Sequence, residues 1–316
     1  MEQLTLFLQQ LLNGLSLGSI YALIALGYTM VYGVLRFINF AHGDVYMLGA
    51  FAGYFLAPVV AHFIPLTDMD SFTVQNTVPI LANAGLVLIG SMLVCAVAGV
   101  IIERLVYRPL RNRPRLNVLI TAIGVSLFLQ NIMQYVFGAT PRAFPQLIPV
   151  QPIEGLGDIT LLTTQGAIIL STIILMLILW LIVTKTKLGM AMRALSLNPT
   201  ACSLVGVNND VVISFTFALG SALAAAAGIL VSLDSPSITP LMGNLPGIKA
   251  FCAAVFGGIG NIPGAALGGV IIGILETMVV GYIRPELKDA IAFAALIIIL
   301  LFKPTGILGK AEREKV

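Results

Sequence analysis

The chain has 316 residues, of which 58% are hydrophobic and only 10% charged, and its mean hydropathy is +1.01. This composition excludes an ordinary soluble domain and indicates that a lipid bilayer is the main solvent. Each crossing helix needs ~20 residues, so the chain holds about eight to ten crossings. No sequence remains for a separate catalytic or nucleotide-binding module. We therefore expect an all-α, polytopic membrane bundle that forms a single transmembrane domain over residues 1–316.

Eight apolar segments are long enough to cross a bilayer as helices. The predicted crossings are residues 11–35, 45–64, 79–103, 117–137, 166–184, 211–233, 264–283 and 289–303. A further apolar piece, residues 248–258, is too short to cross and is predicted to be re-entrant or a half helix. The stretch 138–165, rich in Pro and Gly, is predicted to be the largest exterior loop and a contact for an extracytoplasmic partner.

The distribution of Lys and Arg predicts the orientation, because basic residues favour the cytoplasmic side. Of the 17 Lys and Arg residues, 13 lie at Arg36, in residues 104–115, in residues 185–193 or in the C-terminal tail. The other four are Arg142, Lys249, Arg284 and Lys288, in segments assigned to the outside. Asp68 and Asp70 are assigned to the outside as well. Threading the eight crossings through these assignments predicts an outside N-terminus and a cytoplasmic C-terminus.

A polar break separates the first two predicted crossings. It lies between apolar segments on both sides. Irregular backbone at membrane depth survives only where its polar groups face protein or water, and transporters build substrate routes from such segments. We therefore expect this break to line a translocation pathway. The predicted pathway residues here are Asn39, Phe40, His42, Gly43, Asp44 and Tyr46.

Catalytic or metal chemistry at this break is disfavoured. The chain has only two histidines, and the second, His62, is predicted near the opposite end of the next crossing. One His and one Asp do not make a metal site, and no hydrolase or metalloprotease motif is present. The cysteines Cys95, Cys202 and Cys252 are scattered without metal spacing and are predicted to be small core residues. We expect a chain that is not an enzyme and holds no cofactor.

A second, glycine-rich break precedes the crossing 264–283. Its spaced glycines resemble a dinucleotide fingerprint but lack the required strand–turn–helix setting. The pairs Gly264/Gly268 and Gly269/Gly273 are small-xxx-small spacings that let helices pack closely in lipid. The predicted pathway residues in this break are Gly257, Gly258, Gly260, Asn261, Pro263 and Gly264.

Glu276 lies within the crossing that follows. It shares a helix face with Gly269 and Gly273, so we expect it to point into the bundle. An intramembrane carboxylate is a functional candidate, and Glu276 is added to the predicted pathway. The alternative is a structural carboxylate bonded to a neighbouring helix. The sequence leaves both interpretations open.

A capped helix is predicted in the cytoplasmic loop at about residues 185–210. Asn198 is a good N-cap, Pro199 suits the first helical position and Gly206 suits the C′ stop. Such a helix could present apolar residues to a partner protein. The alternative is that the helix lies on the membrane surface. The predicted contacts are Arg193, Ala194, Asn198, Pro199, Ala201, Leu204 and Gly206.

Several of these segments together resemble one family. Residues 38–49, 102–110, 257–265 and 303–309 are similar, in this order, to the signatures of branched-chain amino acid ABC transporter permeases, and to the H-type more than the M-type subunit. The resemblance covers nearly the whole chain. Two departures are visible: Asp44 stands where Glu is also common, and the loop carries Arg193-Ala194-Leu195 where the generic importer loop has a Glu.

The resemblance implies a permease subunit of a bacterial inner-membrane importer for branched-chain amino acids. It implies a second related permease, two cytoplasmic ATPase subunits that bind ATP and Mg²⁺, and a periplasmic binding protein, with no nucleic acid partner. The loop 185–210 would then be the coupling loop to an ATPase. A urea or amide permease of the same family, a stand-alone channel and an ion-coupled transporter using Glu276 stay open as alternatives.

Overall fold

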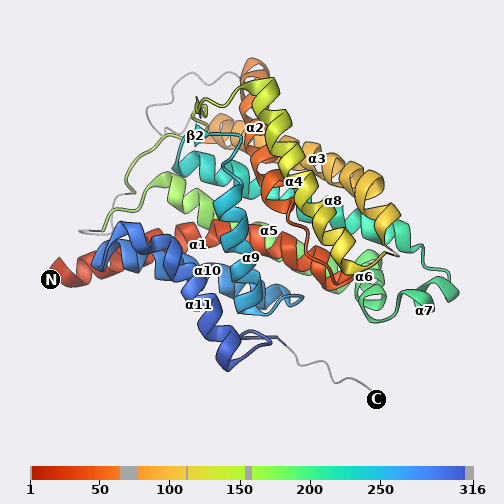
Figure 1. Ribbon diagram of the computed structural model, residues 1–316. Helices are drawn as coiled ribbons and strands as arrows, with labels where there is room; N and C mark the ends of the chain where they lie inside the picture. Colours follow the sequence, from red (N-terminus) through yellow and green to blue (C-terminus); the bar gives the residue numbers. More distant parts are fainter. Residues whose placement is uncertain (1, 65–76, 112, 154–158, 310–316) are drawn as a thin grey trace.

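The protein is described here from a computed structural model that covers residues 2–64, 77–111, 113–153 and 159–309. It is a bundle of helices with one pair of two-residue strands (Figure 1). The helices are α1 (Glu2–Leu35), α2 (His42–Phe63), α3 (Thr77–Ile102), α4 (Arg115–Phe137), α5 (Thr163–Lys185), α6 (Lys187–Leu197), α7 (Pro199–Leu204), α8 (Asn209–Asp234), α9 (Asn244–Gly257), α10 (Ile262–Tyr282) and α11 (Lys288–Phe302). The strands are β1 (Arg142–Ala143) and β2 (Ser237–Ile238). Short π and 3-10 turns, Glu103–Tyr107 and Arg108–Leu110, continue α3, and a 3-10 turn, Pro285–Leu287, precedes α11.

The all-α membrane class is confirmed. Within the described residues, seven helices are long and apolar enough to cross a membrane: α1, α2, α3 with its continuation, α4, α5, α8 and α10. α11, the last predicted crossing, is shorter, at 15 residues. The three cysteines are buried, as predicted. Asp68, Asp70 and the basic residues beyond residue 309 lie outside the described residues.

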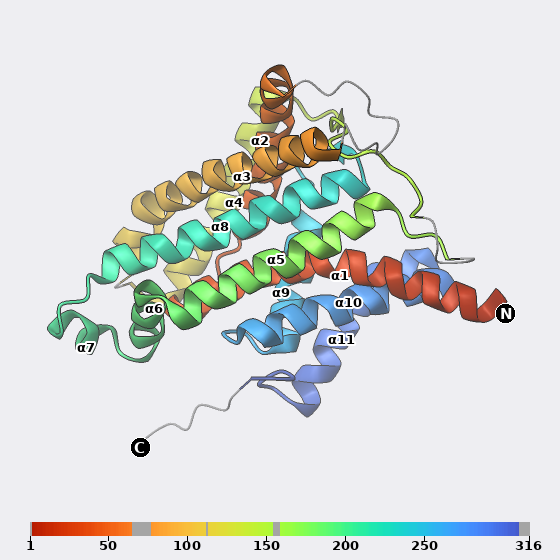
Figure 2. The same ribbon diagram turned by 180° about the vertical axis from the view of Figure 1, so that it is seen from behind.

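α1 and α10 run antiparallel at the centre of the bundle and pack along most of their lengths (Figure 2). Their contact is made by small residues: a Cβ on Gly273 would overlap the backbone of Gly18, and a Cβ on Gly269 would overlap Ala22. Gly264 and Gly268 face the other way, against Gly257 and Ala253 of α9. The predicted small-residue packing is therefore confirmed, and α10 uses it on two faces.

α8 is the second buried helix and ties α2 and α3 to the core. Its N-terminus is capped by Asn208, whose side chain accepts hydrogen bonds from the backbone N–H groups of Asp210 (3.1 Å) and Val211 (3.3 Å). Further along, Gly228 packs on the Tyr46 carbonyl of α2 and Ala225 packs on Gly49. These contacts leave no room for a larger side chain, so α8 and α2 are held together closely.

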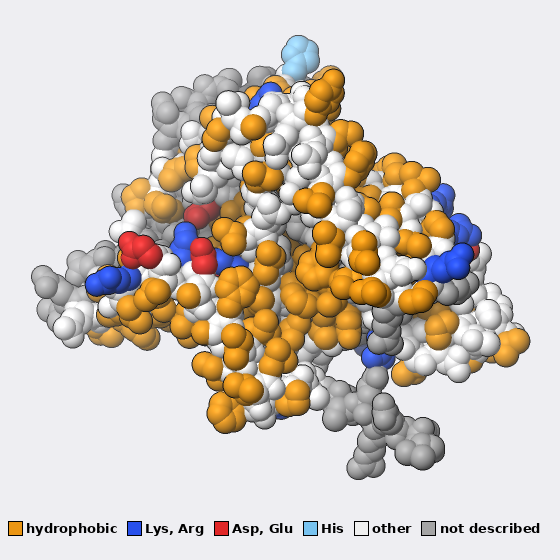
Figure 3. All heavy atoms as spheres, viewed as in Figure 1, with side chains coloured by type: hydrophobic (Ala, Val, Ile, Leu, Met, Phe, Trp, Pro, Cys, Tyr) orange, Lys and Arg blue, Asp and Glu red, His pale blue; other side chains and the backbone are white. Residues whose placement is uncertain are grey.

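The outer helices α3, α4 and α5 expose apolar side chains, as a lipid-facing layer does. Hydrophobic side chains are spread over the whole face shown in Figure 3, and basic side chains gather at its right-hand edge. α4 packs only lightly on the rest of the bundle, through α2. Between α3 and α4 lies an apolar cavity of about 550 Å³, lined by residues such as Ile101 and Phe128.

With the seven long helices and the 15-residue α11, the short helix α9 makes a ninth crossing of the bundle by the described part of the chain. β2 pairs antiparallel with β1 of the predicted exterior loop, whereas the turn after α9 lies against Gly33 near the opposite end of α1. Residues 239–243 and the 14 residues of α9 thus carry the chain from the paired strands to the turn beside Gly33, and α9 crosses the middle of the molecule (Figure 1). Eight crossings would return both termini to one side. The predicted half helix is thus present as α9, and the predicted orientation needs residues 239–257 to take the chain from one side to the other, which the sequence pattern did not predict.

Candidate functional site

The first predicted break returns the chain from the end of α1 into the bundle. Arg36, with a left-handed φ of 59°, ends α1, and α2 begins only at His42. The His42 ring packs on Gly27, which lies two turns before the end of α1, about 12 Å along its axis. α2 therefore starts inside the bundle, and the irregular residues 36–41 connect the end of α1 to this deeper starting point.

α9 starts beside the start of α2. A Cβ on Gly243 would overlap the Gly43 carbonyl, and Gly247 lies against the same glycine. Only glycine permits backbones to approach so closely. Two helix N-termini thus meet at half depth, where the helix dipoles give a positive potential.

A cavity of about 290 Å³ opens at this meeting point, bounded by α1, α2, α4 and α9. This volume is at the small end of the ~300–1,000 Å³ typical of small-molecule sites. One part of its wall is polar and the rest is apolar. Its lining residues are Tyr28, Phe40, Gly43, Asp44, Ile123, Ser126, Leu127, Gln130, Gly243, Asn244, Gly247 and Ile248.

Gln130 links the polar groups of the cavity. Its Nε2 atom donates to Asp44 Oδ1 (2.8 Å) and Asn244 Oδ1 (2.7 Å), and it lies 3.1 Å from Ser126 Oγ on its own helix. Asp44 and Gln130 are both buried. These bonds connect α4 to the starts of α2 and α9.

The predicted residues of the first break do not all line this cavity. Phe40, Gly43 and Asp44 do. Asn39 is buried and accepts a hydrogen bond from Tyr107 Oη (2.6 Å), and His42 packs edge-on against Tyr28 with ring centroids 4.7 Å apart. Tyr46 is buried in the core.

The residues of the second break lie at the other end of α9, not at this cavity. Gly257, Gly258, Gly260, Asn261, Pro263 and Gly264 form the turn from α9 to α10 and its first helical turn. Asn261 caps α10 by accepting from the Gly264 N–H (3.4 Å), and its Nδ2 donates to the Leu308 carbonyl (2.7 Å). The C-terminal segment also pairs here, since Ile307 N–H donates to the Phe256 carbonyl (2.9 Å).

Glu276 points into the bundle, as predicted, and pairs with a buried lysine. Lys249 Nζ of α9 lies 2.9 Å from Glu276 Oε1 and 2.6 Å from Asp289 Oδ1 of α11, and Tyr21 Oη donates to Glu276 Oε2 (3.0 Å). Lys249 is 4% exposed and Glu276 2%. The assignment of Lys249 to an exterior segment is therefore wrong: it lies inside the half helix, where charges must be paired.

The predicted cytoplasmic helix is present as α7. Asn198 Oδ1 accepts from the Ala201 N–H (3.0 Å), Pro199 is the first helical residue and Gly206 has φ +84°. Leu204 is 83% exposed. The preceding helix α6 holds Arg193 and Ala194, and its last residue, Leu197, is 84% exposed.

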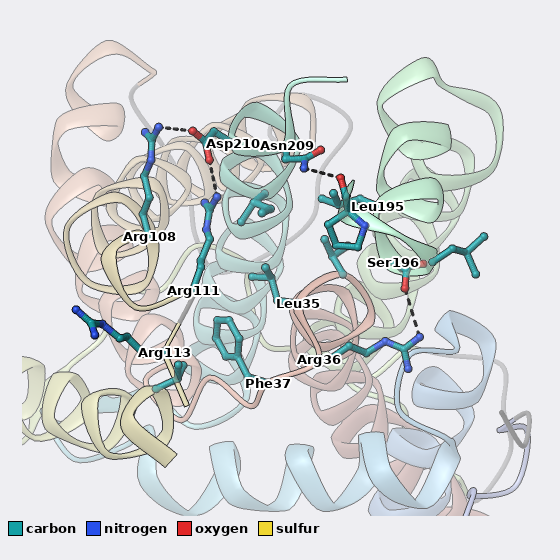
Figure 4. A pocket seen from close by; sticks show the side chains of 15 residues that line it. Leu35, Arg36, Phe37, Arg108, Arg111, Arg113, Leu195, Ser196, Asn209 and Asp210 are labelled. Atoms are coloured by element: carbon teal, nitrogen blue, oxygen red, sulfur yellow. Dashed lines mark hydrogen bonds and ion pairs between the residues drawn. The ribbon is translucent and has the colours of Figure 1, made fainter. Parts of the chain in front are cut away.

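A second, larger cavity of about 820 Å³ separates α6 and α7 from the loop after α3 (Figure 4). Arg108 and Arg111 both pair with Asp210 at the start of α8, with Arg111 Nη1 2.6 Å from Asp210 Oδ1. Across the cavity, Arg36 Nη2 donates to the Ser196 carbonyl (3.5 Å). The predicted basic loops thus gather at one end of the bundle.

Sequence reasoning missed most of the cavity wall. Ser126 and Gln130 are polar residues four apart within a predicted crossing, a spacing that places them on one helix face, and this was the available signal. Asn244 follows a glycine at the start of the half helix. Tyr28 gives no comparable signal, because a tyrosine in an apolar crossing is ordinary.

Helices that start at half depth around a polar cavity define a membrane transport protein. The family described as "branched-chain amino acid transport system / permease component" matches residues 10–300, and the chain belongs to this family. The high-affinity branched-chain amino acid transport system permease proteins LivH of Salmonella typhimurium and Escherichia coli K12 are each 43% identical over 318 residues, covering 100% of this chain and 99% of theirs. The corresponding BraD of Pseudomonas aeruginosa is 42% identical over 319 residues, covering all of both chains. No solved structure matches the chain. The chain is thus a multi-pass inner-membrane permease.

Proposed function

We propose that this chain is the H-type permease subunit of an ATP-driven importer for branched-chain, hydrophobic amino acids. The full-length similarity to permeases named for that transport carries the proposal. The geometry supports it: a polar cavity with apolar walls lies where α2 and α9 begin. The pathway would run past Phe40, Gly43 and Asp44.

The proposed complex contains a second related permease, two cytoplasmic ATPases carrying ATP and Mg²⁺, and an extracytoplasmic binding protein. α6 and α7 would contact an ATPase, since Leu197 and Leu204 expose apolar surface at the basic end of the bundle. The lightly packed α4, with the apolar cavity beside it, leaves a face for the second permease. The described residues between α4 and α5, which include β1, would contact the binding protein.

Uptake of radiolabelled leucine tests the proposal. The chain is expressed with its genomic partner subunits in cells that lack their own branched-chain transport, and we expect uptake that ceases on ATP depletion at a constant ion gradient. Cells with the partners alone are the control. Uptake of urea instead of leucine, or leucine transport by vesicles holding the chain alone, would contradict it.

A further inference from the structure

We propose that the cavity bounded by Asp44, Gln130 and Asn244 is a binding site within the membrane for the ammonium group of an amino-acid substrate. The inference rests on the proposed function and assigns a chemical task to one part of it. Three observations carry it: a buried carboxylate oxygen without a hydrogen-bond donor, a carboxylate charge without a counter-ion and the shape of the remaining wall.

The polar wall leaves one oxygen of Asp44 without a hydrogen-bond donor among the described residues. The two hydrogens on Gln130 Nε2 are used by Asp44 Oδ1 and Asn244 Oδ1, and the Ser126 hydroxyl beside them (3.1 Å from Nε2) is a further neutral donor to Asp44. Among the described residues, Asp44 Oδ2 has no hydrogen-bond partner, although Asp44 is only 2% exposed. A buried acceptor without a donor is costly, and an ammonium group brings three donors.

The charge of Asp44 also lacks a side-chain counter-ion. None of the described residues that line the cavity is Lys or Arg. Lys249 is occupied elsewhere, between Glu276 and Asp289. The dipole of α2 favours a carboxylate in its first turn. Asp44 is not directed only at its own helix, however, because its Oδ1 atom accepts a hydrogen bond from Gln130 of α4. A cation in the cavity would complete the charge pair.

The rest of the cavity fits the remainder of a hydrophobic amino acid. Ile123 and Leu127 of α4 and Ile248 of α9 form apolar wall, which suits a branched aliphatic side chain. The N-terminus of α9, a 14-residue helix, directs its dipole toward a carboxylate. Urea carries no charge and would leave the carboxylate unpaired, so the cavity favours an amino acid.

A charge-relocation experiment tests the site in the complete transport system. Asp44→Asn removes the charge with little change of shape, and we expect leucine uptake to fall about tenfold or more, as the loss of one charge-assisted bond predicts. Adding Gln130→Glu returns a carboxylate to the same cavity from another helix, and we expect most of the uptake to return. Glu286→Gln, which removes an exposed carboxylate, is the control and is expected to transport normally.

A tethered cation provides the second test. Gln130→Lys places an ammonium group beside Asp44 and is expected to abolish uptake while the subunits still co-purify. Ser235→Lys, at an exposed position beyond the end of α8, adds the same charge outside the cavity and is expected to leave uptake intact. Because α4 packs lightly, Gln130→Lys should still fold.

The outcomes separate the two proposals. If the unmodified system takes up no branched-chain amino acid, the proposed function fails. If it does, but Asp44→Asn or Gln130→Lys transports leucine normally, the ammonium site is overturned. The site is also overturned if Gln130→Glu fails to rescue an assembled Asp44→Asn complex. The carboxylate of Asp44 would then act only by stabilising the N-terminus of α2.

Discussion

At the scale of single residues, the buried charges sort into two groups with different surroundings. Lys249, Glu276 and Asp289 satisfy one another across α9, α10 and α11. Asp44 meets only neutral partners. A cluster of buried charges that pair with one another, here called the clamp, is typical of a structural role. A buried carboxylate that has no counter-ion is typical of a binding site. The surroundings therefore favour a structural task for Glu276, whose place in the pathway stays a prediction.

Lys249→Met tests this clamp. It leaves two carboxylates without their cation, and breaking a buried ion pair from one side costs ~3–5 kcal/mol. We expect a clearly lower Tm of the purified permease in detergent. The double variant Lys249→Met with Glu276→Met should recover much of the loss, because no buried charge stays unpaired.

The double variant also separates the two interpretations of Glu276. If it is stable and transports leucine, Glu276 is structural. If it is stable and inactive, the carboxylate takes part in transport, and the clamp interpretation is incomplete.

At the scale of elements, glycine contacts set how the central helices pack. Gly273 lies on the backbone of Gly18, whereas a Cβ on Gly124 of α4 would meet no atom within 4 Å. The same substitution at the two positions therefore isolates the packing effect from helix propensity.

We expect Gly273→Ala to destabilise the permease by ~1–3 kcal/mol, because α1 and α10 must separate. Gly124→Ala should be neutral or stabilising by up to ~1 kcal/mol, because alanine is the better helix former. Thermal unfolding of both variants in one detergent measures the difference. Equal Tm values would contradict the close packing of α1 and α10.

The α7 helix is the second element whose role can be isolated. Leu204→Asp replaces an exposed apolar side chain worth ~1.5–3 kcal/mol if it is buried on a partner, so we expect about tenfold or greater loss of co-purifying ATPase and of leucine uptake. Ser203→Asp adds the same charge to the same helix and is the control. Unchanged uptake in Leu204→Asp would exclude α7 from the coupling surface.

At the scale of the whole molecule, the ninth crossing fixes which loops share a side. Single cysteines at Ser235 and Arg284 should react with a membrane-impermeant maleimide added to intact cells, because both positions are exposed at the exterior end. A cysteine at Leu204 should react only after permeabilisation. The native cysteines are buried and give a low background. Opposite labelling of the Ser235 and Arg284 positions would mean that α9 does not cross.

Much of this architecture was predictable from the sequence. Apolar length located the long helices, and Asn198, Pro199 and Gly206 predicted α7 because capping is local chemistry. The wall of the cavity was not predictable, because Gln130, Asn244 and Asp44 meet only through the packing of three helices. Lys249 was misplaced for a related reason: its partners Glu276 and Asp289 are distant in sequence, so the pairing that permits its burial left no local pattern.

The uninterrupted length of α8 has a mechanical consequence. Its capped start lies beside α7 and holds Arg108 and Arg111 through Asp210, and further along the same rod presses on Tyr46, two residues beyond Asp44. A shift imposed at the α7 end, where the proposed ATPase would bind, would thus reach the cavity through one continuous helix, without unwinding any helical turn. The size of the conformational change in the proposed transport cycle would then depend on how far the glycine-lined helix surfaces slide past one another, more than on bending of the backbone.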